Sequence, residues 1–199
     1  MVALDDFTNE VLSDCPHTPQ ILIDKAILRT AQDFYTRTRT WVVDATNISV
    51  TPGISTYIID VPTQYESTGN IVSNIILGID SITTITKAPV PSPFRYKEGT
   101  IVFDDSPTYS DTLVLAVQLK PTLNSFVLPD SSWEYYSEAI IAGSKYYLQR
   151  MKGKEWSDIM AARENLLIFN QQIVRSRINK NSEFGYKQLS HRPSNLGWE

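Results

Sequence analysis

Apolar side chains recur at helical spacing near both ends of the chain, whereas the segment between the ends alternates as strands do. Leu4, Phe7 and Val11 indicate a short first helix, and a stripe from Ile23 to Trp41 predicts a second helix from about Pro19 to Arg39. Helices at opposite ends of one domain bury their apolar stripes against each other. This spacing therefore predicts that the two ends of the chain pack together.

Two further helices are expected in the C-terminal part of the chain. Ser131 stands three residues before Glu134, which is the spacing of a capping box, and an apolar stripe from Trp133 to Met151 follows. Gly153 marks a turn. The last helix is predicted by the stripe Ile159, Ala162, Leu166, Phe169 and Ile173.

The middle of the chain predicts hairpins. They comprise residues 47–61 with a turn at Pro52 and Gly53, residues 71–88 with a turn at Gly78 to Ser81, and residues 99–121 with a connection at Pro107. Leu113 to Leu119 is apolar enough for a strand that is buried on both faces. The segment 88–96 contains three prolines, which favour an extended bridge over a ladder strand.

The sequence thus predicts an α+β protein: a four-helix bundle of two N-terminal and two C-terminal helices, with an inserted antiparallel β module and an extended C-terminal arm. The bundle and the β module are each expected to bury a core of their own. The expected division is 1–41 for the N-terminal helices, 42–128 for the β module, 129–180 for the C-terminal helix pair and 181–199 for the arm. The last sixteen residues, "FGYKQLSHRPSNLGWE", follow neither the helical nor the strand period.

Charge is distributed unevenly along the chain. Residues 1–144 hold eight Lys and Arg against seventeen Asp and Glu, a net of −9, whereas residues 145–199 hold ten against five, a net of +5. The two parts are expected to attract each other or oppositely charged neighbours. Cys15 is the only cysteine, which excludes an internal disulfide and a cysteine-based metal centre. The acidic N-terminus and the lack of a long apolar run predict a chain that is neither exported nor membrane-spanning.

Groups suited to catalysis are few. The histidines are His17 and His191, and no phosphate-binding glycine loop or familiar hydrolase motif is present. Asp104, Asp105 and Asp111 could hold a hard cation, but their stretch lacks the glycine and the final glutamate of a calcium loop. We expect no enzyme activity, no cofactor and no metal.

Two sets of side chains leave interpretations open. The cations of the last helix, Arg163, Arg175, Arg177 and Lys180, form either a solvated helix face or a basic surface for an acidic protein. A sequence-specific DNA reader would be basic overall, whereas this chain has a pI of about 5.2. The aromatic residues of the middle segment either cover the core or form a carbohydrate- or receptor-binding β module; they are Tyr57, Tyr65, Phe94, Tyr96 and Tyr109.

The chain resembles the tail adaptor proteins, or head-to-tail connector proteins, of short-tailed bacteriophages. The segments that carry the resemblance are "AILRTAQDFYTRTRTW", "AIIAGSKYYLQRMKGKEWSDIMAARENLLIFNQQI" and the end with "HRPSN". The resemblance implies a helical bundle with an inserted β region that assembles as a homo-oligomeric ring, usually of twelve, through which DNA passes. It implies two partners, the portal protein and a tail tube or nozzle protein. The expected location is the head–tail junction of the virion, after assembly in the host cytoplasm.

The resemblance also suggests roles for single residues. An arm that docks on the portal would use the anchors Phe184, Tyr186, Leu189, Arg192, Leu196 and Trp198; the alternative is a tail that folds back onto its own bundle. Arg37 and Arg39, like Arg175 and Arg177, are either cations that compensate a helix end or contacts across a ring interface. Trp41 is expected to seal the junction between the bundle and the β module.

Overall fold

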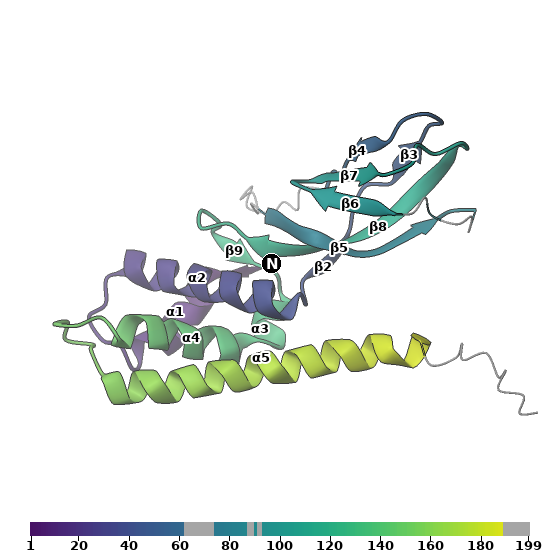
Figure 1. Ribbon diagram of the computed structural model, residues 1–199. Helices are drawn as coiled ribbons and strands as arrows, with labels where there is room; N and C mark the ends of the chain where they lie inside the picture. The colour runs from purple at the N-terminus through teal and green to yellow at the C-terminus, as the bar shows by residue number, and fades with distance from the viewer. Residues whose placement is uncertain (62–73, 87–89, 91–92, 189–199) are drawn as a thin grey trace, which may run out of the picture.

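The computed structural model describes residues 1–61, 74–86, 90 and 93–188, with the backbone alone for residues 181–188. This part of the chain is α+β, with a layer of helices beside the sheets (Figure 1). The helices are α1 (Leu4–Leu12), α2 (Gln20–Thr38), α3 (Ser131–Glu134), α4 (Ser137–Gln149) and α5 (Ile159–Gln188). The predicted first and second helices are confirmed, because α1 and α2 cover them.

Three antiparallel sheets contain the strands of the described residues. The strands are β1 (Val2–Ala3), β2 (Val42–Asp44), β3 (Ile48–Val50), β4 (Thr56–Ile58), β5 (Asn74–Thr84), β6 (Phe94–Lys97), β7 (Thr100–Phe103), β8 (Asp111–Pro121) and β9 (Val127–Leu128). The main sheet is built on β8, which pairs with β2, β3 and β5; a second sheet has the order β4, β7, β6, and β1 pairs with β9. Val117 on β8 pairs with both Val43 and Ile79, so β2 and β5 lie on opposite edges of β8.

The strand predicted from Leu113 to Leu119 is confirmed as part of β8, the centre of the main sheet, but the prediction that it is buried on both faces is wrong, because Val114 and Ala116 on the other face are only half-buried. Leu113, Leu115, Val117 and Leu119 are all at most 1% exposed. Alternate residues of β8 face α2 and its neighbours, since α2 packs on this strand. One apolar core therefore continues from the helices into the sheets, and the expectation of two separate cores is wrong.

The helices do not form the predicted four-helix bundle. α1 has only nine residues and packs on α2 and α4, whereas α5 has thirty and packs mainly on α4. α2 packs on β8 of the main sheet as well as on α4, so the helices form an open layer against the sheet rather than a closed bundle. The apolar stripe that predicted one helix from Ser131 to Met151 is also divided, because the chain leaves helical geometry at Tyr135 and Tyr136, between α3 and α4. No side-chain capping bond forms at α3, so the predicted capping box is wrong.

None of the three predicted hairpins forms. Gly53 has the predicted turn geometry, with φ of +82°, but the turn joins β3 to β4, which pair with different partners, β8 and β7. Around Gly78 the chain makes two β-bulges within one continuous strand, β5. β7 and β8 belong to different sheets. A hairpin does form between β6 and β7, at Glu98 and Gly99, where both φ values are positive; it includes Phe94 to Tyr96, which the sequence predicted as a bridge.

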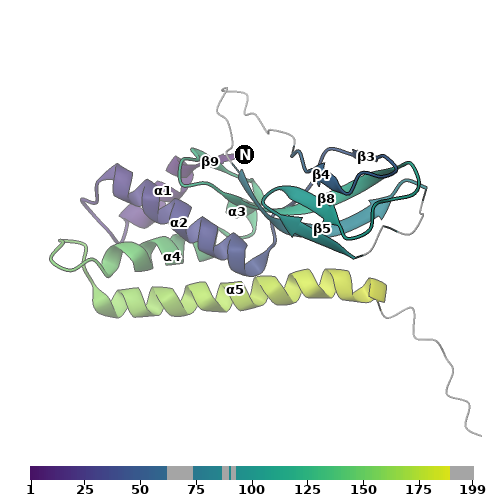
Figure 2. The ribbon, with the colours of Figure 1, turned by 45° about the horizontal axis from the view of Figure 1, so that its top comes forward.

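The C-terminal helix is longer than the sequence predicts. Asp158 Oδ1 accepts hydrogen bonds from the backbone N–H groups of Met160 (2.9 Å) and Ala161 (3.0 Å), which starts α5. The helix then continues to Gln188, so the first residues of the predicted extended arm are helical. Both views show α5 running past the end of α4 and along the main sheet (Figure 1, Figure 2).

Candidate functional site

A basic cleft lies where the C-terminal end of α2 meets α5 and the main sheet. Its volume is about 460 Å³ and its walls carry Arg37, Arg39, Arg177, Lys180 and Asp80. Four cations and one carboxylate therefore line the cleft. Two of the predicted interface residues on α2 are thus brought beside one of the two on α5.

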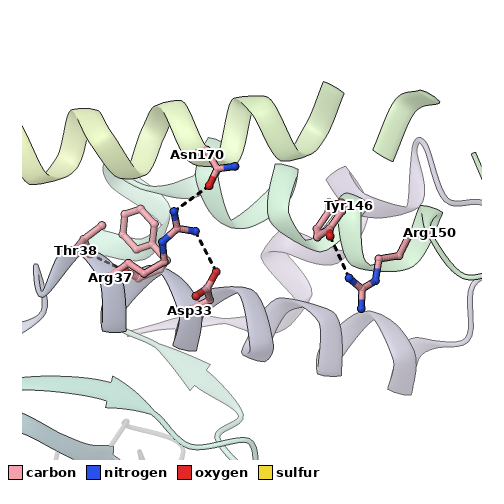
Figure 3. A network of polar contacts seen from close by, with 7 residues as sticks. Asp33, Arg37, Thr38, Tyr146, Arg150 and Asn170 are labelled. Atoms are coloured by element: carbon pink, nitrogen blue, oxygen red, sulfur yellow. Dashed lines mark hydrogen bonds and ion pairs between the residues drawn. The ribbon is translucent and has the colours of Figure 1, made fainter. Parts of the chain in front are cut away.

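The backbone at the end of α2 places two arginines at the cleft. Arg39 ends the helix in the left-handed conformation, with φ of 55°, and its N–H donates to the carbonyl of Tyr35 at 2.8 Å. Arg37 donates to Asn170 Oδ1 on α5 at 3.0 Å and lies over the ring of Phe169, 5.8 Å from its centroid (Figure 3). Arg37 also forms an ion pair with Asp33 at 3.5 Å.

Lys180 connects α5 to the sheet at the floor of the cleft. Its Nζ lies 2.7 Å from Asp80 Oδ1 on β5 and also donates to the carbonyl of Arg39. Gln118 Nε2 on β8 donates to the same Asp80 oxygen at 2.7 Å. Burial alone would raise the pKa of Asp80, but the hydrogen bonds from Lys180 and Gln118 and the charge of Lys180 outweigh it and lower the pKa.

Lys180 and Asp80 therefore neutralise each other, whereas two arginines of the cleft form no ion pair with a carboxylate of the described residues. Among the residues that the structure describes, neither Arg39 nor Arg177 takes part in an ion pair. Both side chains are exposed. The cleft is left with a surplus of positive charge that an acidic partner could meet.

A second basic groove lies on the same side of the helical layer, between α2 and α4. It has a volume of about 320 Å³ and is lined by Lys25, Arg29 and Arg150 together with Leu22 and Tyr147. The guanidinium of Arg150 lies 5.3 Å from the centroids of both Tyr146 and Tyr147 and donates to the Tyr146 hydroxyl at 3.0 Å. Figure 3 shows Arg150 and Arg37 in one view, on the face that α2 shares with α4 and α5. We refer to the cleft and the groove together as the basic face.

The opposite side of the helical layer is acidic. α1 lies behind α2 and α4 in Figure 1, and it carries the exposed carboxylates of Asp5, Asp6 and Glu10. Asp24 of α2 lies on the same side, close enough to Asp5 for the two charges to interact. The pKa of Asp24 is raised, mainly by burial; a hydrogen bond from Gln20 lowers it, and the charge of Asp5 raises it further. Asp24 and Arg29 are five residues apart and so point about 140° apart around the helix. We refer to Asp5, Asp6, Glu10 and Asp24 as the acidic face.

The other predicted residues lie elsewhere. Arg175 is directed away from the basic cleft and lines a different cleft of about 730 Å³ that also holds Glu134 and Glu138. Trp41 is buried between α2 and the main sheet: its ring lies 5.5 Å from that of Tyr35, and its carbonyl accepts a hydrogen bond from Leu119 N–H on β8.

The predicted arm residues fall on both sides of the end of α5. The backbone of Phe184 and Tyr186 is part of this helix. Leu189, Arg192, Leu196 and Trp198 lie outside the described residues.

The residues of the two faces were only partly visible in the sequence. Lys25 and Arg29 are four residues apart, which makes them neighbours on the surface of a helix, whereas Arg37 lies about 80° further around the axis from Arg29. Arg150 gave no such signal, because only the packing of α4 on α2 brings it to Lys25 and Arg29.

The aromatic residues considered for sugar binding are mostly engaged in packing. Tyr57 is 9% exposed, and its hydroxyl is bonded to the backbone of Thr51 and Ile54. The rings of Phe94 and Phe103 lie 6.2 Å apart, and the Tyr96 hydroxyl donates to the carbonyl of Ile76 at 3.1 Å. Tyr65 lies outside the described residues. These contacts favour the interpretation that the aromatic residues cover the core over the interpretation that they form an exposed surface for binding sugar.

Comparison with known proteins adds no family. No model of a known protein family matches the sequence, and a search of curated proteins finds no match. Within the described residues, no three His, Cys, Asp or Glu side chains gather where they could hold a metal ion. In the same part of the chain, no helix combines the length and the apolar character needed to span a bilayer.

Proposed function

We propose that the chain is a structural virion protein of a short-tailed bacteriophage that forms an adaptor ring between the portal and the tail, with DNA passing through the ring. The observation that carries this proposal is the separation of charge across the helical layer, with the basic face on one side and the acidic face on the other. Two of the three segments in which the sequence resembles tail adaptor proteins include parts of α2, α4 and α5, the helices of the basic face, and the third, with "HRPSN", lies outside the described residues. The dodecamer, the portal protein and the tail tube or nozzle protein as partners are taken from that resemblance.

Opposite charge on opposite sides favours a head-to-tail arrangement of copies. Two basic faces or two acidic faces repel, whereas the basic face of one copy attracts the acidic face of the next. Because the two faces differ, the contact is heterologous, and repeating it in one direction generates a closed ring or an open filament. A ring on a symmetric partner such as a portal satisfies every such contact.

The strength of this contact should depend on salt. An exposed ion pair contributes about 0.2 to 1 kcal/mol, and screening at physiological ionic strength weakens it further. Charge alone therefore orients the copies, and assembly needs a partner that concentrates them. We assign part of that task to residues 189–199, with Leu189, Arg192, Leu196 and Trp198 as anchors on the portal.

The direct test is electron microscopy of the protein mixed with the purified portal of the same virus. We expect a closed annulus with the symmetry of the portal in low salt, and separate particles when the salt is raised to about 1 M, where the Debye length is about 3 Å. A mixture in which the portal stays bare at low salt would refute the proposal.

A deletion separates the arm from the ring contact. Removing residues 189–199 leaves all described helices intact, so we expect an unchanged melting temperature together with weaker binding to the portal. If the deletion lowers the melting temperature by several degrees and leaves portal binding unchanged, the tail serves its own protomer and the arm assignment is wrong.

A carbohydrate- or receptor-binding β module on a phage tail is the alternative function. It would require aromatic rings that are free to stack on a sugar, whereas Tyr57 and Phe94 pack within the protein. Binding of the isolated chain to a glycan array would favour this alternative over the adaptor ring.

A further inference from the structure

One side of α5 carries a stripe of exposed apolar side chains. Among the residues that the structure describes, Met160, Leu167, Val174 and Ile178 are 66%, 63%, 56% and 61% exposed. They follow one another at intervals of seven, seven and four residues, so they lie along one side of the helix. A shallow groove of about 470 Å³ extends along the helix from Leu167 to beyond Ile178. We call these four residues the α5 stripe.

The α5 stripe lies opposite the side of the helix that packs on the rest of the molecule. That inner side buries Ala162, Phe169 and Ile173, each at most 3% exposed. Both views show the sheets and the other helices on one side of α5 (Figure 1, Figure 2). A helix that packs on one neighbour usually presents polar residues on its other side, whereas α5 presents a second apolar surface. An exposed patch of this kind marks an interaction site.

The C-terminal end of the chain is too short to cover the α5 stripe. α5 continues to Gln188, so residues 189–199 begin about 42 Å along the helix from Met160 and about 32 Å from Leu167. Eleven fully extended residues span at most about 40 Å. Met160 is therefore out of their reach, and Leu167 is within reach only of a nearly straight segment.

The segment between β4 and β5 would have to pass around α5 to reach the stripe. The two ends of residues 62–73 join Val61, just after β4, to Asn74, the first residue of β5. Lys180 is the residue of α5 that contacts β5, and it points about 160° away from Ile178 around the helix. The α5 stripe thus faces away from the sheet to which this segment is attached.

Charges of both signs flank the α5 stripe. Glu164 and Arg175 lie about 40° and 60° to one side of Met160 around the helix, and Arg163 lies about 60° to the other side. All three side chains are exposed, and none takes part in an ion pair within the described part of the chain. A partner helix whose flanks carry one sign of charge would meet at least one like charge here.

A second copy of α5 packed antiparallel brings opposite charges together. In an antiparallel pair related by a twofold axis, the same side of each helix meets, so Glu164 of each copy can face Arg175 of the other. An axis midway between these two residues also sets Met160 beside Ile178 of the other copy. Each end of the stripe is then covered, and two ion pairs form beside it.

The remaining charges of α5 do not oppose this arrangement. Arg163 comes nearly level with Arg177 of the other copy. Arg177, however, points about 100° away from Met160 around the helix and lines the basic cleft. Lys180 points toward the sheet, where it pairs with Asp80.

We propose that the α5 stripe is a contact between two copies of this chain, packed antiparallel, with Glu164 of each copy paired with Arg175 of the other. The contact is isologous, because the same surface is used on both copies. It does not rest on the adaptor ring, whose head-to-tail contact uses the basic and acidic faces. A pair of copies joined through α5 leaves both of those faces free.

Sedimentation equilibrium of the full chain without any partner tests the proposal. Over about 5 to 500 µM at low salt we expect a monomer–dimer equilibrium with a Kd on the order of 10 to 100 µM, because one helix of each copy makes a small interface. Ile178→Asp should raise this Kd about tenfold or more. Ile85→Asp is the matched control, because Ile85 has the same exposed fraction, 61%, but lies just after β5. Circular dichroism shows whether both variants are folded.

An exchange of charges tests the antiparallel pairing. Glu164→Arg places arginine opposite arginine, and Arg175→Glu places glutamate opposite glutamate, so each variant should dimerise about tenfold more weakly. The two substitutions in one chain should restore the Kd of the unmodified chain. Glu164 and Arg175 are about 17 Å apart along one helix, so they cannot pair within a copy, and this recovery would require two copies.

Three results would overturn the proposal. The first is a folded chain that stays monomeric over the whole concentration range; if it dimerises once residues 189–199 are deleted, the C-terminal end is the occupant of the stripe. The second is equal weakening by Ile178→Asp and Ile85→Asp, or by neither, which would place the contact on another surface. The third is a double charge exchange that dimerises no better than the single substitutions.

Discussion

The interior of the helical layer and the junction between α5 and the main sheet are held together by different kinds of contact. In the interior, Gly143 of α4 lets Thr30 of α2 and Phe169 of α5 approach the α4 backbone closely. At the junction, α5 reaches the sheet through the polar contacts of Lys180 with Asp80. Small changes of side-chain volume in the interior should therefore change the free energy of unfolding, whereas at the junction the free energy of unfolding should respond to changes of charge and pH.

Gly143→Ala should cause the largest loss of stability. The added Cβ would lie 2.3 Å from Thr30 Cγ2 and 3.0 Å from Phe169 Cδ2, and both side chains are buried with little room to move. We expect the free energy of unfolding to fall by about 3 kcal/mol, although Ala favours a helix over Gly by about 1 kcal/mol. Urea unfolding followed by circular dichroism measures the change.

Two further variants check that crowding is the cause. In Gly78→Ala the nearest atom, Gln118 Oε1, would lie 4.0 Å from the new Cβ, so we expect a change of no more than about 0.5 kcal/mol. Thr30→Ser removes the methyl group that clashes and keeps the hydroxyl. Combined with Gly143→Ala it should restore part of the lost stability, and additive losses in the double variant would contradict this explanation.

Lys180→Met should have the next largest effect, at the junction. The methionine keeps the apolar stem but leaves the Asp80 carboxylate with Gln118 as its remaining side-chain donor. We expect a loss of about 2 kcal/mol in urea unfolding, because a carboxylate that is 9% exposed loses a charged partner. Arg175→Met is the control on an exposed residue of the same helix. Equal effects of the two substitutions would show that the ion pair is not what holds α5 to the sheet.

The contribution of Asp80 should also depend on pH. The folded-state pKa of Asp80 is lowered from its ordinary value of 3.8, so the folded state binds a proton less readily than the unfolded state. Its stabilising contribution is then fully present above pH 3.8 and is lost as the pH falls from there through the folded-state pKa. Asp80→Asn lacks this proton equilibrium, so its stability should fall less over that range than that of the unmodified chain. Parallel acid-unfolding profiles would disprove the role of Asp80.

The helices were largely predictable from the sequence, whereas the strand pairing was not. The apolar period fixes which side of α2 is buried, whatever that side packs against, and so α2 was found within one residue at each end. A glycine signals an unusual backbone but not its partner: Gly53 makes the predicted turn and Gly78 marks a bulge, yet neither joins two paired strands. Pairing with β8 is decided by contacts far apart in the sequence, which local patterns do not encode.

The same limit applies to the candidate site. Arg37 and Arg39 could be placed at a helix end from the sequence, but their approach to Arg177 depends on how α2 and α5 pack. Arg175 and Arg177 looked equivalent because they are neighbours on one helix. They are two residues apart and point about 200° apart around the helix. Arg177 therefore lines the basic cleft, whereas Arg175 lines the cleft that also holds Glu134.

Charge reversal on the two faces should leave stability almost unchanged and alter association instead. Arg39 and Arg177 are exposed, so Arg39→Glu with Arg177→Glu should change the free energy of unfolding by no more than about 0.5 kcal/mol. The same holds for Asp6→Lys with Glu10→Lys on the acidic face. Each double variant should fail to form rings on the portal, because one of the two head-to-tail surfaces is reversed in every copy.

Mixing the two double variants then distinguishes a head-to-tail contact from a symmetric one. A copy with reversed arginines keeps its acidic face, and a copy with reversed carboxylates keeps its basic face, so these two intact faces can still meet. The two reversed faces are complementary to each other as well, which should let the mixture form alternating rings of even number at low salt. Electron microscopy with the portal detects this recovery. Rings formed by either variant alone, or no ring from the mixture although both variants are folded, would show that these faces are not where the copies meet.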